Sequence, residues 1–282
     1  MIKTKDRLDL FTKEWVVPNA RASVVLTHGF GEHSGRYEHV AEFFNRAEYS
    51  VFAYDMRGHG RSEGARGHTP SYDHFQDDLS RVITRTKQRA STSKIILFGH
   101  SLGGNIALHY GMQRPSGLNA IIASAPWLRR AIEAPAWQTV LARIMASIFP
   151  SFSQQTPSLA GMLTRDPAMA ALGESDPLNH SRMSARLFID VSAAADNLLA
   201  NAKKFKLPLL VTHGTADPVI ALSGSEDFVN NAGSTDKTLL ARTDGLHELH
   251  NDLDRSEYLS LVVDWLDARV PPAKNNGFVT RF

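Results

Sequence analysis

Three side chains far apart in the sequence have the types and the order needed for attack on a carbonyl carbon. Ser101 lies in GHSLG at residues 99–103, a G-x-S-x-G pattern, and Asp217 and His247 follow it. A serine hydroxyl is a weak nucleophile until a base takes its proton, and the base needs an orienting acid. We therefore predict Ser101 as the nucleophile, His247 as the general base and Asp217 as the acid that orients it.

The surroundings of Ser101 predict a strand, a sharp turn and a helix. Residues 94–98 form an apolar run typical of a buried strand, and residues 105–110 suit a helix. The turn between them needs glycine, because larger side chains would clash with neighbouring backbone. For this pattern alone, the alternative is a glycine-rich turn whose serine caps the helix.

The candidate acid and base also follow predicted strands. Asp217 lies in the turn after an apolar run at residues 209–213, and His247 lies in a loop after a short strand at residues 238–240. Open α/β sheets place catalytic groups at these carboxyl ends. Asp217 also fits an ordinary turn residue before proline. His250 competes with His247 as the base, but it lies nearer to the next helix.

Acyl transfer also needs backbone N–H groups that stabilise the carbonyl oxygen, and each contributes about 3 kcal/mol. One such group comes from the residue after the nucleophile, which is Leu102. The predicted strand at residues 24–27 leads into a loop at residues 28–33, where Phe30 would supply the second N–H. Taken alone, that loop is better explained as a generic turn between a strand and a helix.

Five segments resemble the monoacylglycerol lipase and lysophospholipase family of α/β-hydrolases. In the family's order they are HGFGEHSGRY at 28–37, YDMRGHGRS at 54–62, GHSLGG at 99–104, HGTAD at 213–217 and HELH at 247–250. The chain order serine, aspartate, histidine is also that of α/β-hydrolases. The resemblance implies the catalytic and oxyanion roles given above. It further implies that Glu32, Arg36 and His250 hold the polar head group of the substrate.

The alternation of predicted strands and helices indicates an α/β fold with a mostly parallel sheet covered on both faces. We expect an α/β-hydrolase core at residues 1–126 and 187–270. Residues 126–208 contain no convincing strand, whereas ordinary connections are about 2–6 residues plus one helix. We therefore expect an inserted helical cap, or lid, at residues 127–186. A C-terminal tail at residues 271–282 matches no family segment.

Three further elements are predicted within these parts. Residues 8–11 and 14–17 indicate an early hairpin, and residues 193–204 indicate a core helix. The expected cap has an apolar stripe at helical spacing, formed by Trp137, Val140, Leu141, Ile144, Met145 and Ile148. We expect this stripe to pack on the core and partly line an acyl channel. The alternative is contact with the lipid surface of a membrane or micelle.

The composition excludes several classes of protein. The 282 residues include 31 basic and 29 acidic side chains, a net charge of +2 that predicts no nucleic-acid partner. Cysteine is absent, so disulfides and thiol nucleophiles are excluded. We expect no signal peptide and no transmembrane span. The expected location is cytoplasmic, with possible peripheral contact with membranes through the cap.

The sequence thus predicts a serine hydrolase that cleaves carboxylic esters of lipids through an acyl-enzyme, with no metal and no organic cofactor. The favoured substrates are small-molecule monoacylglycerols or lysophospholipids. A general short-chain carboxylesterase, a peptidase and a non-catalytic binding protein of the same fold remain alternatives. Activity is expected to fall below neutral pH as His247 gains a proton, since an ordinary histidine has a pKa of about 6.5.

Overall fold

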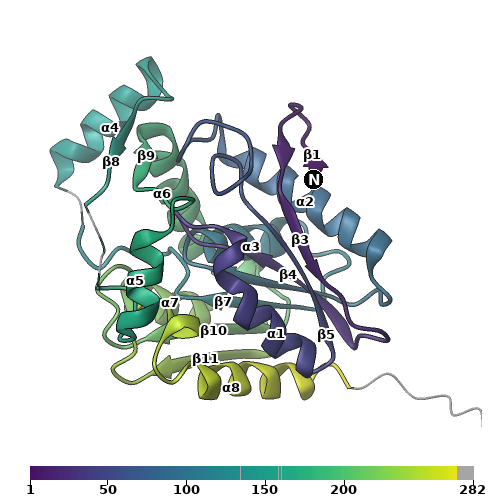
Figure 1. The fold of residues 1–282 in the computed structure, drawn as a ribbon. Coiled ribbons are helices and arrows are strands. Elements are labelled where there is room, and N and C mark those ends of the chain that lie inside the picture. Colours follow the sequence, from purple (N-terminus) through teal and green to yellow (C-terminus); the bar gives the residue numbers. More distant parts are fainter. Residues whose placement is uncertain (134, 158, 160, 272–282) are drawn as a thin grey trace, which may run out of the picture.

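The computed structural model describes residues 1–133, 135–157, 159 and 161–271, which build a seven-stranded sheet at their centre (Figure 1). In spatial order the strands are β11 (Lys237–Arg242), β10 (Leu209–Gly214), β7 (Ala120–Ser124), β6 (Ile95–His100), β4 (Ala22–Thr27), β5 (Tyr49–Tyr54) and β3 (Thr12–Trp15). Neighbouring strands are parallel except β3 and β5, which are antiparallel. Of the predicted tail, residues 272–282 lie outside the described residues.

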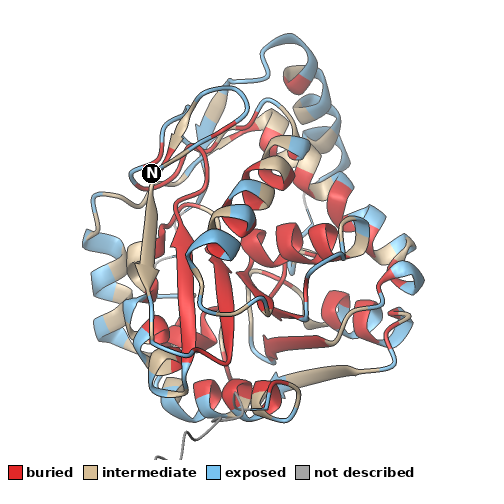
Figure 2. Cartoon of the chain, turned by 90° about the vertical axis from the view of Figure 1, so that its right-hand side faces the viewer, coloured by how far each residue is buried: buried red, intermediate tan, exposed pale blue. Residues whose placement is uncertain are grey.

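Helices cover both faces of the sheet, which is why its central strands are buried along their whole length. Val24 and Leu26 of β4 share a core with the helices α1 (Glu38–Arg46) and α8 (Arg255–Asp267). Val25 faces the other core, formed with α2 (Tyr72–Arg89), α3 (Leu102–Gln113), α6 (Ala185–Ala200) and α7 (Leu222–Asn231). Figure 2 shows the buried strands between these two layers of helices.

The strand order places a switch point between β4 and β6. From β4 the chain continues to β5 on one side, and β6 then pairs with the other side of β4. The loops that leave two such strands diverge, and ligands bind in the crevice between them. Phe30 follows β4 and Ser101 follows β6, so the fold brings two of the predicted site residues to this point.

The predicted early hairpin is wrong. The strand β2 (Asp9–Leu10) pairs with β1 (Ile2–Lys3), whereas β3 joins the central sheet. Between β2 and β3, Phe11 binds other loops through its backbone, with its N–H donating to Ser62 Oγ at 2.8 Å and its C=O accepting from Asp55 N–H at 3.0 Å. The two residues of the predicted turn, at 12–13, belong to β3 instead. The predicted core helix also begins earlier, at Ala185.

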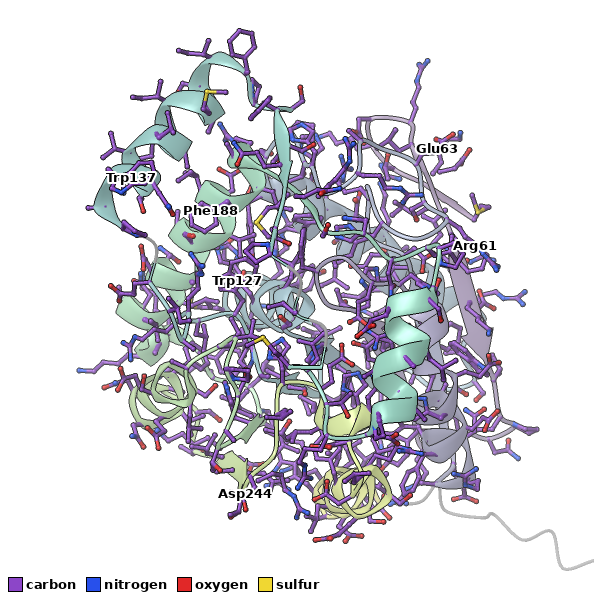
Figure 3. The ribbon with its side chains drawn as sticks, turned by 60° about the vertical axis from the view of Figure 1, so that its left-hand side comes forward. Arg61, Glu63, Trp127, Trp137, Phe188 and Asp244 are labelled. Carbon is purple, nitrogen blue, oxygen red and sulfur yellow. The ribbon has the colours of Figure 1, made fainter. Side chains whose placement is uncertain are left out.

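The segment between β7 and α6 contains α4 (Ala136–Ile148), β8 (Ser153–Gln155), α5 (Pro167–Ser175) and β9 (Arg182–Ser184). Its α4 packs on α6 through smaller residues, with Ala146 buried and Thr139 and Ala142 half-buried. The large apolar residues Trp137, Val140, Leu141, Ile144 and Ile148 are instead 48% to 65% exposed. The expected packing on the core is therefore wrong for five of the six residues of the stripe, and the sixth, Met145, is half-buried. Figure 3 shows Trp137 on the outer side of α4.

Residues 176–184, which we call the return segment, lie against two core loops. His180 N–H donates to Gly31 O at 2.8 Å, and Ser184 N–H donates to Gly67 O at 2.9 Å. His33 Nε2 lies 2.8 Å from Asp176 Oδ2. A Cβ at Gly67 would lie 1.7 Å from the backbone oxygen of Arg182, so the backbones are in direct contact. The return segment is thus fixed to the loop that carries Phe30.

We predict that Gly103→Ala destabilises the protein. A Cβ at Gly103 would lie 2.1 Å from Thr27 O and 2.4 Å from His28 O, so α3 would have to move away from β4. We expect a loss of about 1–3 kcal/mol in the free energy of unfolding, although alanine favours helices. Urea unfolding measures the loss, and an unchanged midpoint would contradict the close contact.

Candidate active site

Ser101 lies in a strained turn between β6 and α3. Its φ is 52° and its ψ is −113°, a conformation that non-glycine residues rarely adopt. Glycine makes this turn possible, because a Cβ at Gly99 would lie 2.2 Å from Gly103 O. The Ser101 side chain makes no capping hydrogen bond to α3. The alternative of a helix-capping serine is therefore wrong.

Asp217 is buried at the end of β10 and is surrounded by donors. Its Oδ1 accepts from Val219 N–H at 2.8 Å and Ile220 N–H at 3.0 Å. Its Oδ2 lies 2.7 Å from His247 Nδ1 and 3.2 Å from His213 Nε2. Burial alone would raise the pKa of Asp217, but His247, His213 and the amide donors lower it well below its usual value. Asp217 is therefore an anion in the folded protein.

The contact with Asp217 fixes the proton of the His247 ring. A carboxylate can only accept, so Nδ1 of the neutral ring carries the proton and Nε2 is left as a base. The His247 ring lies beside His100, the residue before Ser101, with ring centroids 4.8 Å apart. Within the described chain no hydrogen bond joins the Ser101 hydroxyl to His247. Such catalytic bonds are often long without substrate.

The peptide between Gly29 and Phe30 is held by His28. Met56 N–H donates to His28 Nε2 at 2.9 Å, so Nδ1 carries the ring proton and donates it to Gly29 O at 2.7 Å. In a trans peptide the N–H points opposite to the C=O. Phe30 N–H is therefore directed away from His28. Gly29 lies against the nucleophile, since a Cβ there would be 3.4 Å from Ser101 Cβ.

Leu102 begins α3, so its N–H is among those that have no acceptor within the helix. The Phe30 amide follows β4 and the Leu102 amide follows β6, so the two amides lie on the two sides of the switch point. Their role as an oxyanion hole remains a prediction.

Of the three residues predicted to hold a head group, Glu32 and His250 are buried and Arg36 is half-buried. Glu32 and Arg36 form an ion pair at 2.8 Å, and both are bonded to further partners. His250 is fully buried and stacks on Tyr37 at 4.7 Å between ring centroids. Neither ring nitrogen of His250 has a hydrogen-bond partner among the described residues. The structure brings the three together, and their contact with a head group remains a prediction.

Two residues, His213 and Glu248, were not identified from the sequence as candidates for positioning the site. His213 contacts Asp217, and it also donates through Nε2 to Ile220 O at 3.0 Å, which holds the turn that carries the acid. Glu248 directly follows His247 and binds Arg36 with both carboxylate oxygens. The only sequence signal for Glu248 was an acidic residue beside the predicted base.

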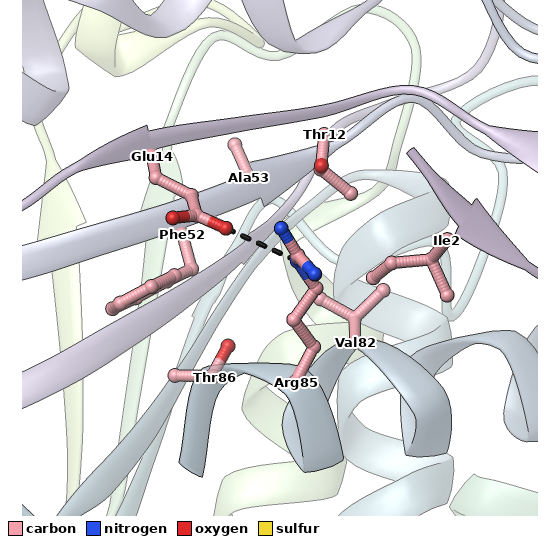
Figure 4. A pocket seen from close by; sticks show the side chains of 8 residues that line it. All are labelled: Ile2, Thr12, Glu14, Phe52, Ala53, Val82, Arg85 and Thr86. Carbon is pink, nitrogen blue, oxygen red and sulfur yellow. Dashed lines mark hydrogen bonds and ion pairs between the residues drawn. The ribbon is translucent and has the colours of Figure 1, made fainter. Parts of the chain in front are cut away.

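A hollow lies beside β3, the edge strand of the sheet, and contains none of these residues (Figure 4). It is lined by Ile2, Thr12, Glu14, Phe52, Ala53, Val82, Arg85 and Thr86. An ion pair between Glu14 and Arg85 at 3.2 Å crosses it. None of the predicted site residues lines this hollow.

The fold and the site define an α/β-hydrolase. Residues 18–254 match the family model Hydrolase_4, described as serine aminopeptidase, S33. The chain therefore belongs to this family, and the predicted fold class and family are confirmed.

Several relatives within this family are named as lipases. The chain is 31% identical over 247 residues to the monoacylglycerol lipase of Mycolicibacterium smegmatis, covering 87% of this chain and 88% of the relative. It is 28% identical over 247 residues to the human monoglyceride lipase, covering 86% and 81%. An uncharacterized abhydrolase domain-containing protein of Dictyostelium discoideum is 31% identical over 281 residues, and the match covers 97% of this chain but 29% of that relative.

The solved structures agree with the sequence comparison. The crystal structure of the Paleococcus ferrophilus monoacylglycerol lipase matches with a TM-score of 0.86 and 32% identity, covering 93% of this chain and 99% of that one. Together with the lipase relatives, this match places the chain among the carboxylic ester hydrolases.

We predict that the protein loses stability as the pH falls from about 6.5 toward 4. Burial lowers the pKa of His28, His59 and His250, and it lowers the pKa of His100 to about 4. In this range the unfolded chain binds protons that the folded chain does not, which favours unfolding. Each such histidine contributes about 1.4 kcal/mol per pH unit.

Urea unfolding at a series of pH values measures this effect. The midpoint should fall steadily below pH 6.5 while the denaturant slope stays constant. A midpoint that is independent of pH between 6.5 and 5 would show that these rings do not stay neutral in the fold.

Proposed function

We propose that this protein hydrolyses monoacylglycerols through an acyl-enzyme on Ser101. The observation that carries the proposal is the contact of an anionic Asp217 with His247 Nδ1 beside the strained Ser101 turn. The names of the relatives supply the substrate class, since lipases of monoacylglycerol match over most of this chain.

In the proposed reaction, His247 Nε2 takes the Ser101 proton as Oγ attacks the ester carbonyl. The carbonyl oxygen becomes negative, and the Phe30 and Leu102 amides donate to it. Asp217 stabilises the positive ring of His247, which then gives its proton to the departing glycerol. Water repeats the cycle on the acyl-enzyme and releases the fatty acid. Every proton transfer uses side chains of this chain.

We further propose that residues 127–186 act as a cap that contacts lipid surfaces through α4. Trp137, Val140 and Ile144 are exposed on its outer side, and Ile132 and Phe149 extend the apolar surface at its ends. An exposed apolar patch of this kind marks an interaction site. No described helix is long and apolar enough to cross a membrane. The contact that we propose is peripheral, and the cytoplasmic location remains a prediction.

We predict that long-chain monoacylglycerols are cleaved faster than acetyl esters, and that Ser101→Ala removes cleavage of both. The loss should be at least about 10⁴-fold, because the nucleophile is absent. Labelling by a fluorophosphonate should disappear in the same variant, while its thermal unfolding stays like that of the wild type.

Three outcomes would count against the proposal. Normal cleavage by Ser101→Ala would refute the nucleophile. Preference for acetyl or butyryl esters would indicate a general carboxylesterase instead. Faster cleavage of aminoacyl amides than of esters would favour the peptidase activity that the family description names.

We predict that the double variant Val140→Asp with Ile144→Asp loses binding to vesicles of phosphatidylcholine. Burying each of these side chains in lipid contributes about 1.5–3 kcal/mol, so binding should weaken at least about tenfold. Vesicle flotation measures it, and hydrolysis of a water-soluble ester should not change.

The matched control is Val16→Asp, which alters an exposed valine just after β3, far from the cap. It should bind vesicles like the wild type. Equal vesicle binding by the double variant and the wild type would show that α4 is not the membrane contact.

A further inference from the structure

A buried group of three charges joins the loop after β4 to the loop that carries His247. Arg36 Nη1 donates to Glu32 Oε2 at 2.8 Å and to Glu248 Oε1 at 2.9 Å. Its Nη2 donates to Glu248 Oε2 at 2.8 Å. The side chains of Arg36, Glu32 and Glu248 are 11%, 5% and 3% exposed. We call this group the Arg36 clamp.

One arm of the clamp holds the loop with the predicted oxyanion amide. Glu32 Oε1 accepts from Gly29 N–H at 2.6 Å and from the Tyr37 hydroxyl at 2.6 Å. Gly29 directly precedes Phe30 and lies against Ser101. A shift of the Glu32 carboxylate would therefore move Gly29 and, with it, the adjoining Gly29–Phe30 peptide, whose N–H is the predicted oxyanion donor.

The other arm holds the loop with the predicted base. Glu248 is covalently next to His247, and its Oε2 also accepts from Asn251 Nδ2 at 2.7 Å. Its N–H donates to Leu163 O at 2.7 Å, so its backbone is fixed as well. Its C=O accepts from Asn251 N–H at 2.8 Å. Among these contacts of Glu248, the bidentate one with Arg36 reaches across to the other loop.

Glu32 and Arg36 stay charged in the folded protein. Burial would raise the pKa of Glu32, but Arg36 and neighbouring histidines outweigh burial and lower this pKa to about 2. Burial would lower the pKa of Arg36, and the two carboxylates raise it above its usual value. Arg36 attracts each of the two carboxylates in surroundings where little water screens the charges.

We propose that Arg36 is a positioning residue that fixes the Phe30 amide and the His247 ring relative to each other, and so sets the rate of acyl transfer from any ester. The proposal rests on the proposed function. It differs from the head-group role predicted from the resemblance, because a clamp acts on every substrate and a head-group contact acts only on glycerol esters.

Two esters with the same acyl chain separate these roles, one a monoacylglycerol and the other a p-nitrophenyl ester that has no glycerol. The variants are Glu248→Gln, which keeps the shape and the Arg36–Glu32 pair, together with Arg36→Gln and Arg36→Lys. We expect Glu248→Gln and Arg36→Gln to lower kcat about ten- to a hundredfold, by the same factor for both esters, with little change in KM. Fluorophosphonate labelling should slow by a similar factor, and Arg36→Lys should recover part of the rate.

The matched control is Arg269→Gln. Arg269 also holds a carboxylate with two nitrogens, that of Asp236, but at the opposite end of the sheet. This variant should keep the wild-type rates on both esters. Thermal unfolding of every variant shows whether it is folded, and Glu248→Gln decides the question if Arg36→Gln fails to fold.

The outcomes separate this inference from the proposed function. A higher KM for the monoacylglycerol alone would overturn the clamp in favour of head-group binding. If kcat of the variants falls only as much as their folded fraction falls, the clamp is also overturned. A wild-type protein that is labelled but cleaves no monoacylglycerol would contradict the proposed substrate, while slower labelling of Glu248→Gln would still support the clamp. A wild-type protein that is not labelled would overturn both.

Discussion

The close backbone contact between the start of α3 and the end of β4 is the constraint on which the site depends. Gly103 has no room for a side chain beside Thr27 O and His28 O, and Ser101 accepts a positive φ as the chain turns into α3. This contact sets the Ser101 turn directly beside the loop that carries Phe30. A looser turn would relieve the strain but would separate the two groups that must meet one carbonyl.

Electrostatics then fixes the protonation state of each group around that turn. Asp217 is held as an anion by its donors, and this anion determines which nitrogen of His247 carries the proton. His28 is neutral because burial lowers its pKa and because its Nε2 must accept from Met56 N–H. The orientation of the Gly29–Phe30 peptide therefore depends on a histidine that takes no part in the proposed reaction.

Much of the fold was predictable from the sequence because its signals are local. Buried strands such as β7 (Ala120–Ser124) are continuous apolar runs, and G-x-S-x-G marks its own turn. The contact of Asp217 with His247 was expected because both follow strands of one sheet. The Arg36–Glu248 contact was not predictable, because it joins residues 212 positions apart without a pattern. The exposed side of α4 was not predictable either, since an apolar stripe does not reveal which side of a helix meets the protein.

The return segment at residues 176–184 has a consequence for exchanging parts between related enzymes. Its backbone lies on Gly31 and Gly67, in direct contact with the loop that carries Phe30. A graft that replaced this stretch would therefore disturb the loop that carries Phe30. The exchangeable unit is therefore shorter than the whole insertion, and it ends before Leu163, whose C=O accepts from Glu248 N–H in the loop that carries His247. A chimera that transplants α4 alone leaves the backbone contacts of Leu163 and of the return segment in place.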